Sequence, residues 1–464
     1  MRLPSPDSRH TPRHRLRSWA GVAVLGLGLA TGCRHGAATE RPLDARAQAR
    51  EYLEKKQPER ALPLLEAESA RAPEDLELAR MLTEAQVKAG RTDTWIAELQ
   101  RRNAQVERAE NHYMLGLAYF SRASDAGGPA VAAFERAVEL KPEEPELHYR
   151  LGLARLESEQ YAAAVGPLRR AAELAPERAG IRLPLAKALH RTGDSAGAVA
   201  ALGALVRMSP SRAEVATARA LMDQIADPFA RFPKAAEPKL EEGLRYLREL
   251  DAPHPAIVAF EEILRDYPDL AVVHALMGLA WQRLDDAGRA VEEFKRAIEL
   301  APEDGKNHFY LGELYLGRQR PEAARTHLEK AVELNPLQDV AWFRLGDIHL
   351  EQRDLKAAGE AFRVLTSLAP DEEAPRGKLA LVRQLEGDWA GAERELLYVV
   401  EKNPDNLEFT LRLGVLFTEQ AKQSSRPEER KEAAGKAERW LRKVLEAQPE
   451  NAMASRALQQ LKSP

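Results

Sequence analysis

The sequence predicts an all-α fold, an α-solenoid of about eleven helix–turn–helix repeats in two stacks. One observation is a proline every 34 residues, at Pro268, Pro302, Pro336, Pro370 and Pro404, with a second series at Pro142, Pro176 and Pro210. With 29 prolines in 464 residues, four further hits at one offset have a chance of roughly one in 10⁵, so the period is real. Two further observations are residue types that keep the same phase and apolar residues at helical spacing.

The residue types that keep the phase are alanine, 12 residues before each proline, and a bulky apolar residue eight before it. The alanines are Ala164, Ala198, Ala256, Ala290, Ala324, Ala358 and Ala392, and the bulky residues are Leu168, Leu202, Phe260, Phe294, Leu328, Phe362 and Leu396. A pair such as Leu311-Gly312 precedes most of these prolines by 24 to 26 residues. Small residues on both helices let their axes approach closely, at a modest cost in helix propensity for glycine.

The two halves of a repeat each carry apolar residues at helical spacing, as in HFYLGELYL from His308 and AARTHLEKAVELNP from Ala323. Gly193-Asp194 and Gly387-Asp388 mark the turn between the halves, because glycine suits a helix C-terminus and aspartate caps the next helix. Proline beyond the second half ends that helix.

These positions resemble the tetratricopeptide repeat, which implies a right-handed superhelix of stacked helix pairs. The repeat that starts at Gly305 matches the family pattern at His308, Leu311, Gly312, Tyr315, Ala324, Leu328, Ala331 and Pro336. In the same register, repeats start near residues 42, 76, 109, 145, 179, 237, 271, 305, 339, 373 and 407. The repeat from 76 is degenerate, with Trp95 at an alanine position, and the last has an insertion of about 11 residues between its helices.

The expected organisation is a signal peptide at 1–32, a tether at 33–41, N-terminal repeats at 42–226, a proline-rich linker at 227–236, C-terminal repeats at 237–451 and a capping helix at 452–464. The linker region holds Pro228, Pro233 and Pro238, which exclude a continuous helix, and two aromatic residues, Phe229 and Phe232. One interpretation is an irregular linker whose phenylalanines fill the junction between the stacks. The alternative is a hinge, or a segment offered to the groove or to a partner.

The N-terminus has the pattern of a cleaved secretory signal. Four arginines between Arg9 and Arg17 precede a 12-residue apolar run, Trp19 to Ala30, which is too short to cross a bilayer. Small residues then precede Cys33, the only cysteine of the chain. The run resembles a bacterial lipoprotein signal, which implies lipidation of Cys33 and anchoring by two or three acyl chains. Ala30 stands where that family favours leucine, and Arg34 follows the cysteine in place of a retention aspartate. The resemblance implies a lipid-anchored, periplasm-facing protein of the cell envelope and favours the outer over the inner membrane.

Charge and motifs exclude several classes of function. Residues 33–464 carry a net charge of −8, which gives no footprint for nucleic acid or anionic lipid, so the membrane is contacted through the N-terminal lipid only. Four histidines, His112, His148, His274 and His308, share repeat position 4, but they lie one per repeat and lack the spacing of a zinc site. No catalytic or phosphate-binding motif occurs. We expect no metal, no cofactor and no enzymatic activity.

The resemblance implies a concave groove lined by the first helices, chiefly at repeat positions 2, 5, 9, 12 and 13. Those positions place Tyr113, Leu117, Phe120, Tyr149, Leu153, Lys187, Arg191, Phe309 and Phe343 in the groove. An apolar, aromatic groove suits a peptide held by a few anchors, although such residues also stabilise packing within the family.

The functional hypothesis is a scaffold that binds one or more envelope proteins or peptides in this groove and assists the assembly of an envelope complex. The alternative is a non-catalytic accessory subunit of an envelope enzyme.

Overall fold

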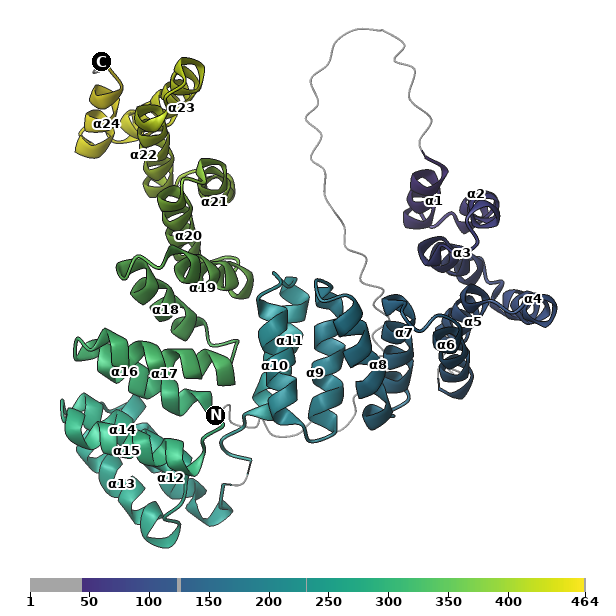
Figure 1. Ribbon diagram of the computed structural model, residues 1–464. Coiled ribbons are helices and arrows are strands. Elements are labelled where there is room, and N and C mark those ends of the chain that lie inside the picture. Colours follow the sequence, from purple (N-terminus) through teal and green to yellow (C-terminus); the bar gives the residue numbers. More distant parts are fainter. Residues whose placement is uncertain (1–43, 123–126, 231, 463–464) are drawn as a thin grey trace.

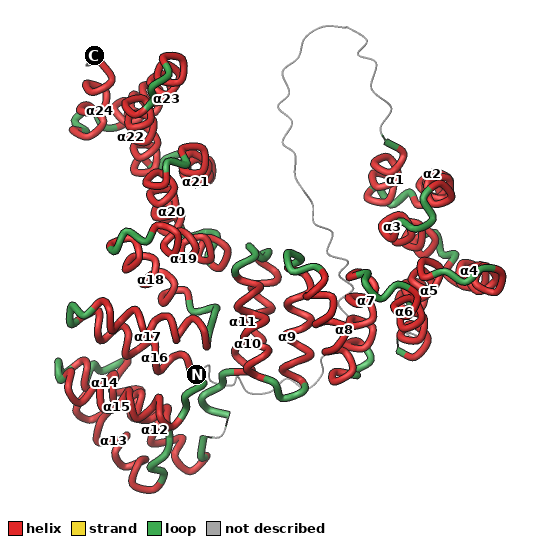
Figure 2. The backbone as a smooth tube through the Cα atoms, in the orientation of Figure 1, coloured by secondary structure: helices red, strands yellow, loops and turns green. Residues whose placement is uncertain are grey.

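In the computed structural model, the described residues, 44–122, 127–230 and 232–462, form 24 α-helices, two short 3-10 turns and no strand (Figures 1 and 2). The predicted all-α solenoid is confirmed. The signal sequence and Cys33 lie outside the described residues. None of the helices in the described part of the chain is long and apolar enough to span a membrane.

The N-terminal stack consists of five helix pairs and one further helix. In chain order these are α1 (Ala45–Glu54) and α2 (Pro58–Arg71), α3 (Leu76–Lys88) and α4 (Thr92–Gln105), α5 (Ala109–Ser121) and α6 (Gly128–Leu140), α7 (Pro145–Glu157) and α8 (Tyr161–Leu174), α9 (Arg182–Arg191) and α10 (Ser195–Val206), and the single α11 (Arg212–Ile225). A 3-10 turn, η1 (Ala179–Ile181), leads into α9. Each helix pair packs on the next pair, as a solenoid requires.

The C-terminal stack consists of six helix pairs and a final helix. After the 3-10 turn η2 (Lys234–Ala236) come α12 (Glu237–Arg248) and α13 (Pro253–Asp266), α14 (Ala271–Arg283) and α15 (Ala287–Leu300), α16 (Gly305–Gly317) and α17 (Pro321–Leu334), α18 (Asp339–Glu351) and α19 (Leu355–Leu368), α20 (Glu373–Glu386) and α21 (Trp389–Lys402), α22 (Leu407–Gln423) and α23 (Pro427–Ala447), and α24 (Ala452–Lys462). Helix α24 packs on both α22 and α23 and covers the apolar end of the stack through Ala454 and Ala457.

The insertion in the last repeat differs from the expected loop between helices. Its residues are mostly helical, because they lengthen α22 to 17 residues and α23 to 21 and leave only Ser424–Arg426 as a turn. Pro427 is accepted here because it stands at the first position of α23, where its missing N–H would have no partner within the helix.

Close approach of the two helices of a repeat depends on a glycine of the first helix. A Cβ atom at Gly116 would lie 2.5 Å from the Phe134 ring, and one at Gly346 would lie 2.6 Å from the Phe362 ring. The same arrangement recurs for the pairs Gly152–Leu168, Gly243–Phe260, Gly278–Phe294, Gly312–Leu328 and Gly414–Leu441. The bulky residue therefore occupies the space that any side chain at the glycine would need.

The turn between the two helices places one residue in the left-handed region. Gly193 and Gly387 have φ angles of 84° and 81°, and the following aspartates cap the next helix by accepting hydrogen bonds from backbone N–H groups. In other repeats the same position holds a residue with a side chain: Lys56, Glu159, Asp285, Gln319 and Arg353. The turn geometry is thus preserved without glycine, at an energetic cost for these residues.

Trp95 explains why the second repeat departs from the pattern. Its ring is buried where other repeats place alanine, and its Nε1 atom lies 3.4 Å from the Thr83 hydroxyl. An indole is too large for two helices to meet closely, so α3 and α4 each pack more extensively on α5 than on each other.

The two stacks share one hydrophobic core although they are separated in sequence. Buried residues from Ala164 to Met222 and from Ala324 to Val382 form a single cluster. Helices α10 and α11 contact α17 and α19, so the end of the N-terminal stack docks midway along the C-terminal stack (Figure 1). Helix α11 has no partner helix of its own repeat, and α19 covers the face where the next repeat would pack.

Ion pairs between the stacks follow one rule: the N-terminal stack supplies arginines and the C-terminal stack supplies carboxylates. Arg207 bonds Glu360 at 2.9 Å, Arg212 bonds Asp371 at 2.8 Å, and Arg219 donates to both oxygens of Asp339 at 2.8 Å. The Arg207 guanidinium also lies 5.3 Å from the centre of the Trp342 ring.

The residues between α11 and η2 run past the start of the C-terminal stack. Phe229 and Phe232 are partly buried there against the apolar cluster of α12 to α14, with ring centroids 5.9 Å apart in an edge-to-face arrangement. Both rings thus pack on the C-terminal stack, and Phe232 also lines the space between the two stacks.

We expect Gly346→Ala to lower the free energy of unfolding by about 1–3 kcal/mol, because the added methyl group overlaps the Phe362 ring. Urea denaturation followed by circular dichroism measures the change. The matched control is Gly435→Ala in α23, where no atom lies within 4 Å of the new methyl group and helix propensity gives a gain of about 0.5–1 kcal/mol. Phe362→Leu should rescue part of the loss. Equal effects of the two alanine variants would contradict the close-approach explanation.

Reversal of charge at Arg207, Arg212 and Arg219 together to glutamate should separate the stacks, since each new carboxylate would face an existing one. Small-angle X-ray scattering should then give a larger radius of gyration with unchanged helix content. The control reverses Arg71 and Arg101, whose partners are on their own helices. An unchanged radius would show that the arginines do not hold the stacks together.

Candidate protein-binding surfaces

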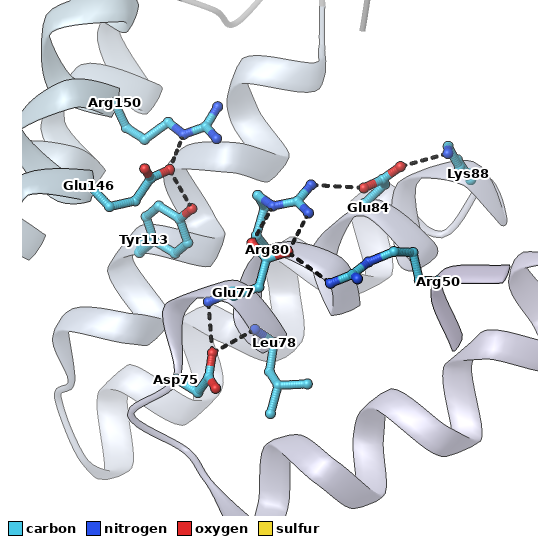
Figure 3. A network of polar contacts seen from close by, with 10 residues as sticks. All are labelled: Arg50, Asp75, Glu77, Leu78, Arg80, Glu84, Lys88, Tyr113, Glu146 and Arg150. Atoms are coloured by element: carbon cyan, nitrogen blue, oxygen red, sulfur yellow. Dashed lines mark hydrogen bonds and ion pairs between the residues drawn. The ribbon is translucent and has the colours of Figure 1, made fainter. Parts of the chain in front are cut away.

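The first helices of the N-terminal stack carry a ladder of charged side chains (Figure 3). Glu77 of α3 lies between Arg50 of α1, at 3.9 Å, and Arg80, at 2.8 Å. Arg80 also bonds Glu84 at 3.1 Å, and Glu84 bonds Lys88 at 2.6 Å. These residues occupy α1 and α3 on the side where the first helices are exposed. We call this set the charged ladder.

Glu146 of α7 forms a second polar cluster beyond the charged ladder (Figure 3). It accepts hydrogen bonds from the Tyr113 hydroxyl at 3.0 Å and from Arg150 at 2.6 Å, and it pairs with Arg178 at 2.5 Å. Burial alone would raise the pKa of Glu146, but the two arginines outweigh it and hold that pKa below its usual value. The carboxylate therefore stays ionised and fixes both arginines.

The groove residues predicted in the N-terminal stack fall into two groups. Tyr113 and Leu117 are buried, and burial raises the pKa of the Tyr113 hydroxyl above its ordinary range. Phe120, Tyr149 and Leu153 are partly exposed, while Lys187 and Arg191 on α9 are exposed. The side chains open to a partner are therefore those of the second group.

In the C-terminal stack the two predicted aromatic residues lie at equivalent places in successive repeats. Phe309 of α16 and Phe343 of α18 are partly buried against the core, and the Lys378 ammonium group lies 6.0 Å from the centre of the Phe343 ring. Alternating charges accompany them along the first helices: Arg344 bonds Glu313 at 2.9 Å, and Lys378 bonds Asp347 at 2.8 Å. The result is an amphipathic surface on α16, α18 and α20, which we call the aromatic–charged surface.

The charged ladder was not among the residues predicted from sequence. Applying the same register to the repeats from 42 and 76 would have found it, because Arg50, Glu77, Arg80 and Glu84 occupy positions 9, 2, 5 and 9. Of the cluster around Glu146, only Tyr113 was among the residues predicted from sequence. Its tyrosine and glutamate come from different repeats, and Arg178 lies in the turn before η1.

Repeat position 4 has a structural role that accounts for two of its four histidines, while the third, His112, bonds Glu107 at 2.9 Å. The Nε2 atoms of His148 and His274 lie 2.7 and 3.0 Å from the carbonyl oxygens of Pro142 and Pro268, six residues earlier. Trp342 donates to Pro336 at 2.9 Å, and Arg182 donates to Pro176 at 3.0 Å. A side-chain nitrogen at this position thus satisfies the proline carbonyl at the turn between repeats.

His308 has a different partner, His327 of α17, with the two Nδ1 atoms 3.1 Å apart. Burial, and then the nearby His327, lower the pKa of His308 to about 4, and burial also lowers the pKa of His327. One ring must donate and the other accept, so the contact requires at least one neutral ring. Among the described residues, no three His, Cys, Asp or Glu side chains come together in a way that could hold a metal ion.

Comparison with known proteins identifies the repeats. Two family models, both described as tetratricopeptide repeat, match the chain, one at residues 123–179, 276–339 and 309–373, and the other at residues 155–222. The chain therefore contains tetratricopeptide repeats. Proteins built from such repeats generally serve as scaffolds that bind peptides or other proteins, and no catalytic family is indicated for this chain. No curated protein matches the sequence at a significant level.

Solved structures with similar folds include YrrB, described as a tetratricopeptide-repeat protein with an unusual peptide-binding site, with 19% identity, a TM-score of 0.38 and coverage of 43% of this chain and 98% of that one. Another is PilF of Pseudomonas aeruginosa, with 19% identity, a TM-score of 0.37 and coverage of 48% and 96%. The Cut9 and Hcn1 assembly covers 90% of this chain and 96% of that one, with 13% identity and a TM-score of 0.35. Likeness at this level indicates nothing about a partner of this chain.

The His308–His327 pair should make stability depend on pH. Because the folded pKa of His308 lies below its ordinary value of 6.5, the unfolded chain takes up protons first as the pH falls. The stability that the neutral pair contributes is therefore complete above about pH 6.5 and is lost towards about pH 4. The double variant His308→Gln, His327→Gln should show a shallower fall in urea midpoint across this interval. His254→Gln, at an exposed site on α13, should retain the original slope, and identical slopes for all three proteins would refute the assignment.

Proposed function

We propose that this chain is a lipid-anchored protein–protein interaction scaffold of the bacterial cell envelope, which binds a partner on its first helices and assists the assembly of an envelope complex. The observation that carries the binding part is the aromatic–charged surface. There Phe309 and Phe343 repeat at one register among the ion pairs of Arg344 with Glu313 and of Lys378 with Asp347.

This surface suits an extended or helical peptide for a physical reason. Partly exposed aromatic side chains on rigid helices supply apolar contact area at low cost in conformational entropy, and such anchors dominate binding at many interfaces. Neighbouring charges of both signs determine where along the surface a peptide binds. They add little net attraction, because each charge is already paired within the surface. The charged ladder of the N-terminal stack has the same paired character.

The proposed anchor is supported by the order of residues at the N-terminus: a basic leader, a 12-residue apolar run, small residues and then Cys33. Two or three acyl chains on one cysteine give stable membrane attachment, whereas one chain alone is only marginal. The outer membrane, with the repeats facing the periplasm, is the proposed location.

Substitution of both aromatic anchors, Phe309→Glu with Phe343→Glu, should abolish capture of the partner in cells without unfolding the chain. Photo-crosslinking from a probe at Tyr310, followed by mass spectrometry, measures capture. Tyr310 belongs to α16, next to Phe309, and its ring stacks on that of Phe294 with the centroids 5.8 Å apart. The control, Glu299→Lys on the exposed side of α15, should keep full capture. Capture that survives the double substitution, in a protein with native circular dichroism, would place the partner elsewhere.

Inhibition of lipoprotein signal cleavage should leave a heavier precursor on a denaturing gel, and Cys33→Ser should move the protein from the membrane to the soluble fraction. Metabolic labelling with an alkyne fatty acid checks the acyl chains directly. A Cys33→Ser protein that stays in the membrane fraction, or a wild-type protein without label, would exclude the anchor while leaving the binding proposal intact.

A further inference from the structure

A large cavity lies where the two stacks dock. It has a volume of about 940 Å³ and is bounded by α10 and the end of α11 on one side and by α17, α18 and α19 on the other. Residues 226–228, 230 and 232 form a third wall, and the starts of α14 and α16 close the end. The cavity thus lies between the two stacks, where α17 and α19 of the C-terminal stack pack against α10 and α11 of the N-terminal stack (Figure 1). We call it the junction cavity.

The floor of the junction cavity is apolar. Helix α10 presents Val199, Ala200 and Gly203, and α11 presents Met222 and Ile225. Phe232, Leu270, Val272 and Val332 continue the surface across the linker and the C-terminal stack. Apolar area of this kind in a concave site favours a ligand that brings apolar groups of its own.

The lining is strongly acidic. Among the described residues that line it, the carboxylates are Asp227, Asp269, Glu303, Asp304, Glu329, Glu333 and Glu360, with one arginine, Arg207, and one histidine, His349. Asp269 is paired with Arg296 at 3.0 Å, and Glu333 is paired with Lys330 at 2.8 Å. Arg207 is already paired with Glu360. Among the described residues, Asp227, Glu303 and Glu329 have no cationic partner. The side chains of these three residues are exposed.

Two further polar groups in the junction cavity, Asp304 and His349, are largely buried. Burial raises the pKa of Asp304, a carboxyl that caps α16 and has no cationic side chain bonded to it. The His349 side chain is 12% exposed, and its buried Nδ1 atom lies 4.0 Å from the Asp354 carboxylate without a hydrogen bond in the described part of the chain. The three carboxylates without a cationic partner, and the His349 nitrogen without a hydrogen bond, would gain from a ligand that carries N–H donors and positive charge.

We propose that the junction cavity binds a basic amphipathic segment of a partner protein, with apolar side chains on the floor and lysine or arginine side chains at the carboxylates. Several carboxylates spread around an apolar floor match several cations spaced along one chain. A single small cation could meet only one or two of them. The volume is at the upper end of the range for ligand pockets, about 300–1,000 Å³, which fits several residues of a peptide.

This site is distinct from the proposed function of the first helices. It is built from α10 and α11 of one stack and mainly from α17 and α19 of the other, so it does not depend on Phe309, Phe343 or Cys33. A ligand that contacts both stacks stabilises their docking. The affinity of the junction cavity therefore depends on how the two stacks are oriented against each other.

Fluorescence anisotropy with the purified full chain tests the proposal, using a fluorescein-labelled 11-residue leucine–lysine peptide of helical amphipathic pattern as the probe. A peptide of equal charge in which serine replaces leucine should bind at least tenfold more weakly. Equal affinity of the two peptides would overturn the proposal, since the apolar floor would then contribute nothing. Spermine at equal charge should not compete effectively, and full competition would point to a small polyamine and overturn it as well.

Two variants locate the site. Glu303→Lys with Glu329→Lys changes exposed, unpaired carboxylates and should weaken the probe at least tenfold. Glu59→Lys with Glu450→Lys produces the same change in net charge at exposed, distant positions and should leave affinity within twofold. Similar losses for both pairs would reveal unspecific attraction to an acidic chain and overturn the proposal.

A third variant tests the cavity itself. Ala200→Trp, at an exposed position on α10, fills the floor and should also reduce affinity at least tenfold, with circular dichroism confirming the fold. Unchanged binding by a folded Ala200→Trp protein would place the peptide outside the junction cavity.

Discussion

The contact between a glycine of the first helix and a bulky residue of the second is the constraint on which the rest of this structure depends. At Gly346 and Phe362 the ring occupies the space of the missing side chain, and six further repeats repeat the arrangement. Close approach of the two axes sets the shape of one repeat, and stacking of like-shaped repeats gives a solenoid. A large residue at the alanine position of the second helix changes this geometry. Trp95 stands in place of the small residue of the second helix, and there α3 and α4 pack on α5 more than on each other.

A second contact joins one repeat to the next. The proline that ends a second helix leaves its own carbonyl oxygen facing the turn, and a side-chain nitrogen at repeat position 4 donates to it, as Trp342 does to Pro336. Histidine, tryptophan and arginine all serve, because each offers an N–H at a similar reach. This explains two of the four histidines in a row that otherwise resembles a set of metal ligands. This contact does not involve the exposed side chains of the first helices, which differ between the stacks. Charged pairs dominate in the N-terminal stack and aromatic anchors in the C-terminal stack.

The break in the middle of the chain changes what the molecule can do. Helix α11 lacks a partner in its own repeat, so its apolar face needs cover, and α19 provides it from a distant part of the sequence. Three arginines and three carboxylates then fix the orientation of the docked stacks. Because surfaces shaped for other neighbours do not match perfectly, their docking leaves a cavity of about 940 Å³ between them. A continuous solenoid of the same repeats would have no such site.

The repeat, its period and the all-α solenoid were predictable from the sequence, since the glycine, alanine and proline positions act within one repeat or between neighbouring repeats. Such short-range constraints recur at fixed intervals, so the amino-acid sequence reveals them directly. It also placed Phe309 and Phe343 at one register, because the period maps each residue onto a helix face. Other features became apparent only in the folded chain. Tyr113 is buried and bonds Glu146, and the inserted residues lengthen α22 and α23. Helices α10 and α11 dock on α17 and α19. Arg219 and Asp339 are 120 residues apart in the chain, and no periodicity connects them. Such contacts depend on how one stack is oriented against another, which is set by the summed packing of many side chains and not by any single repeat.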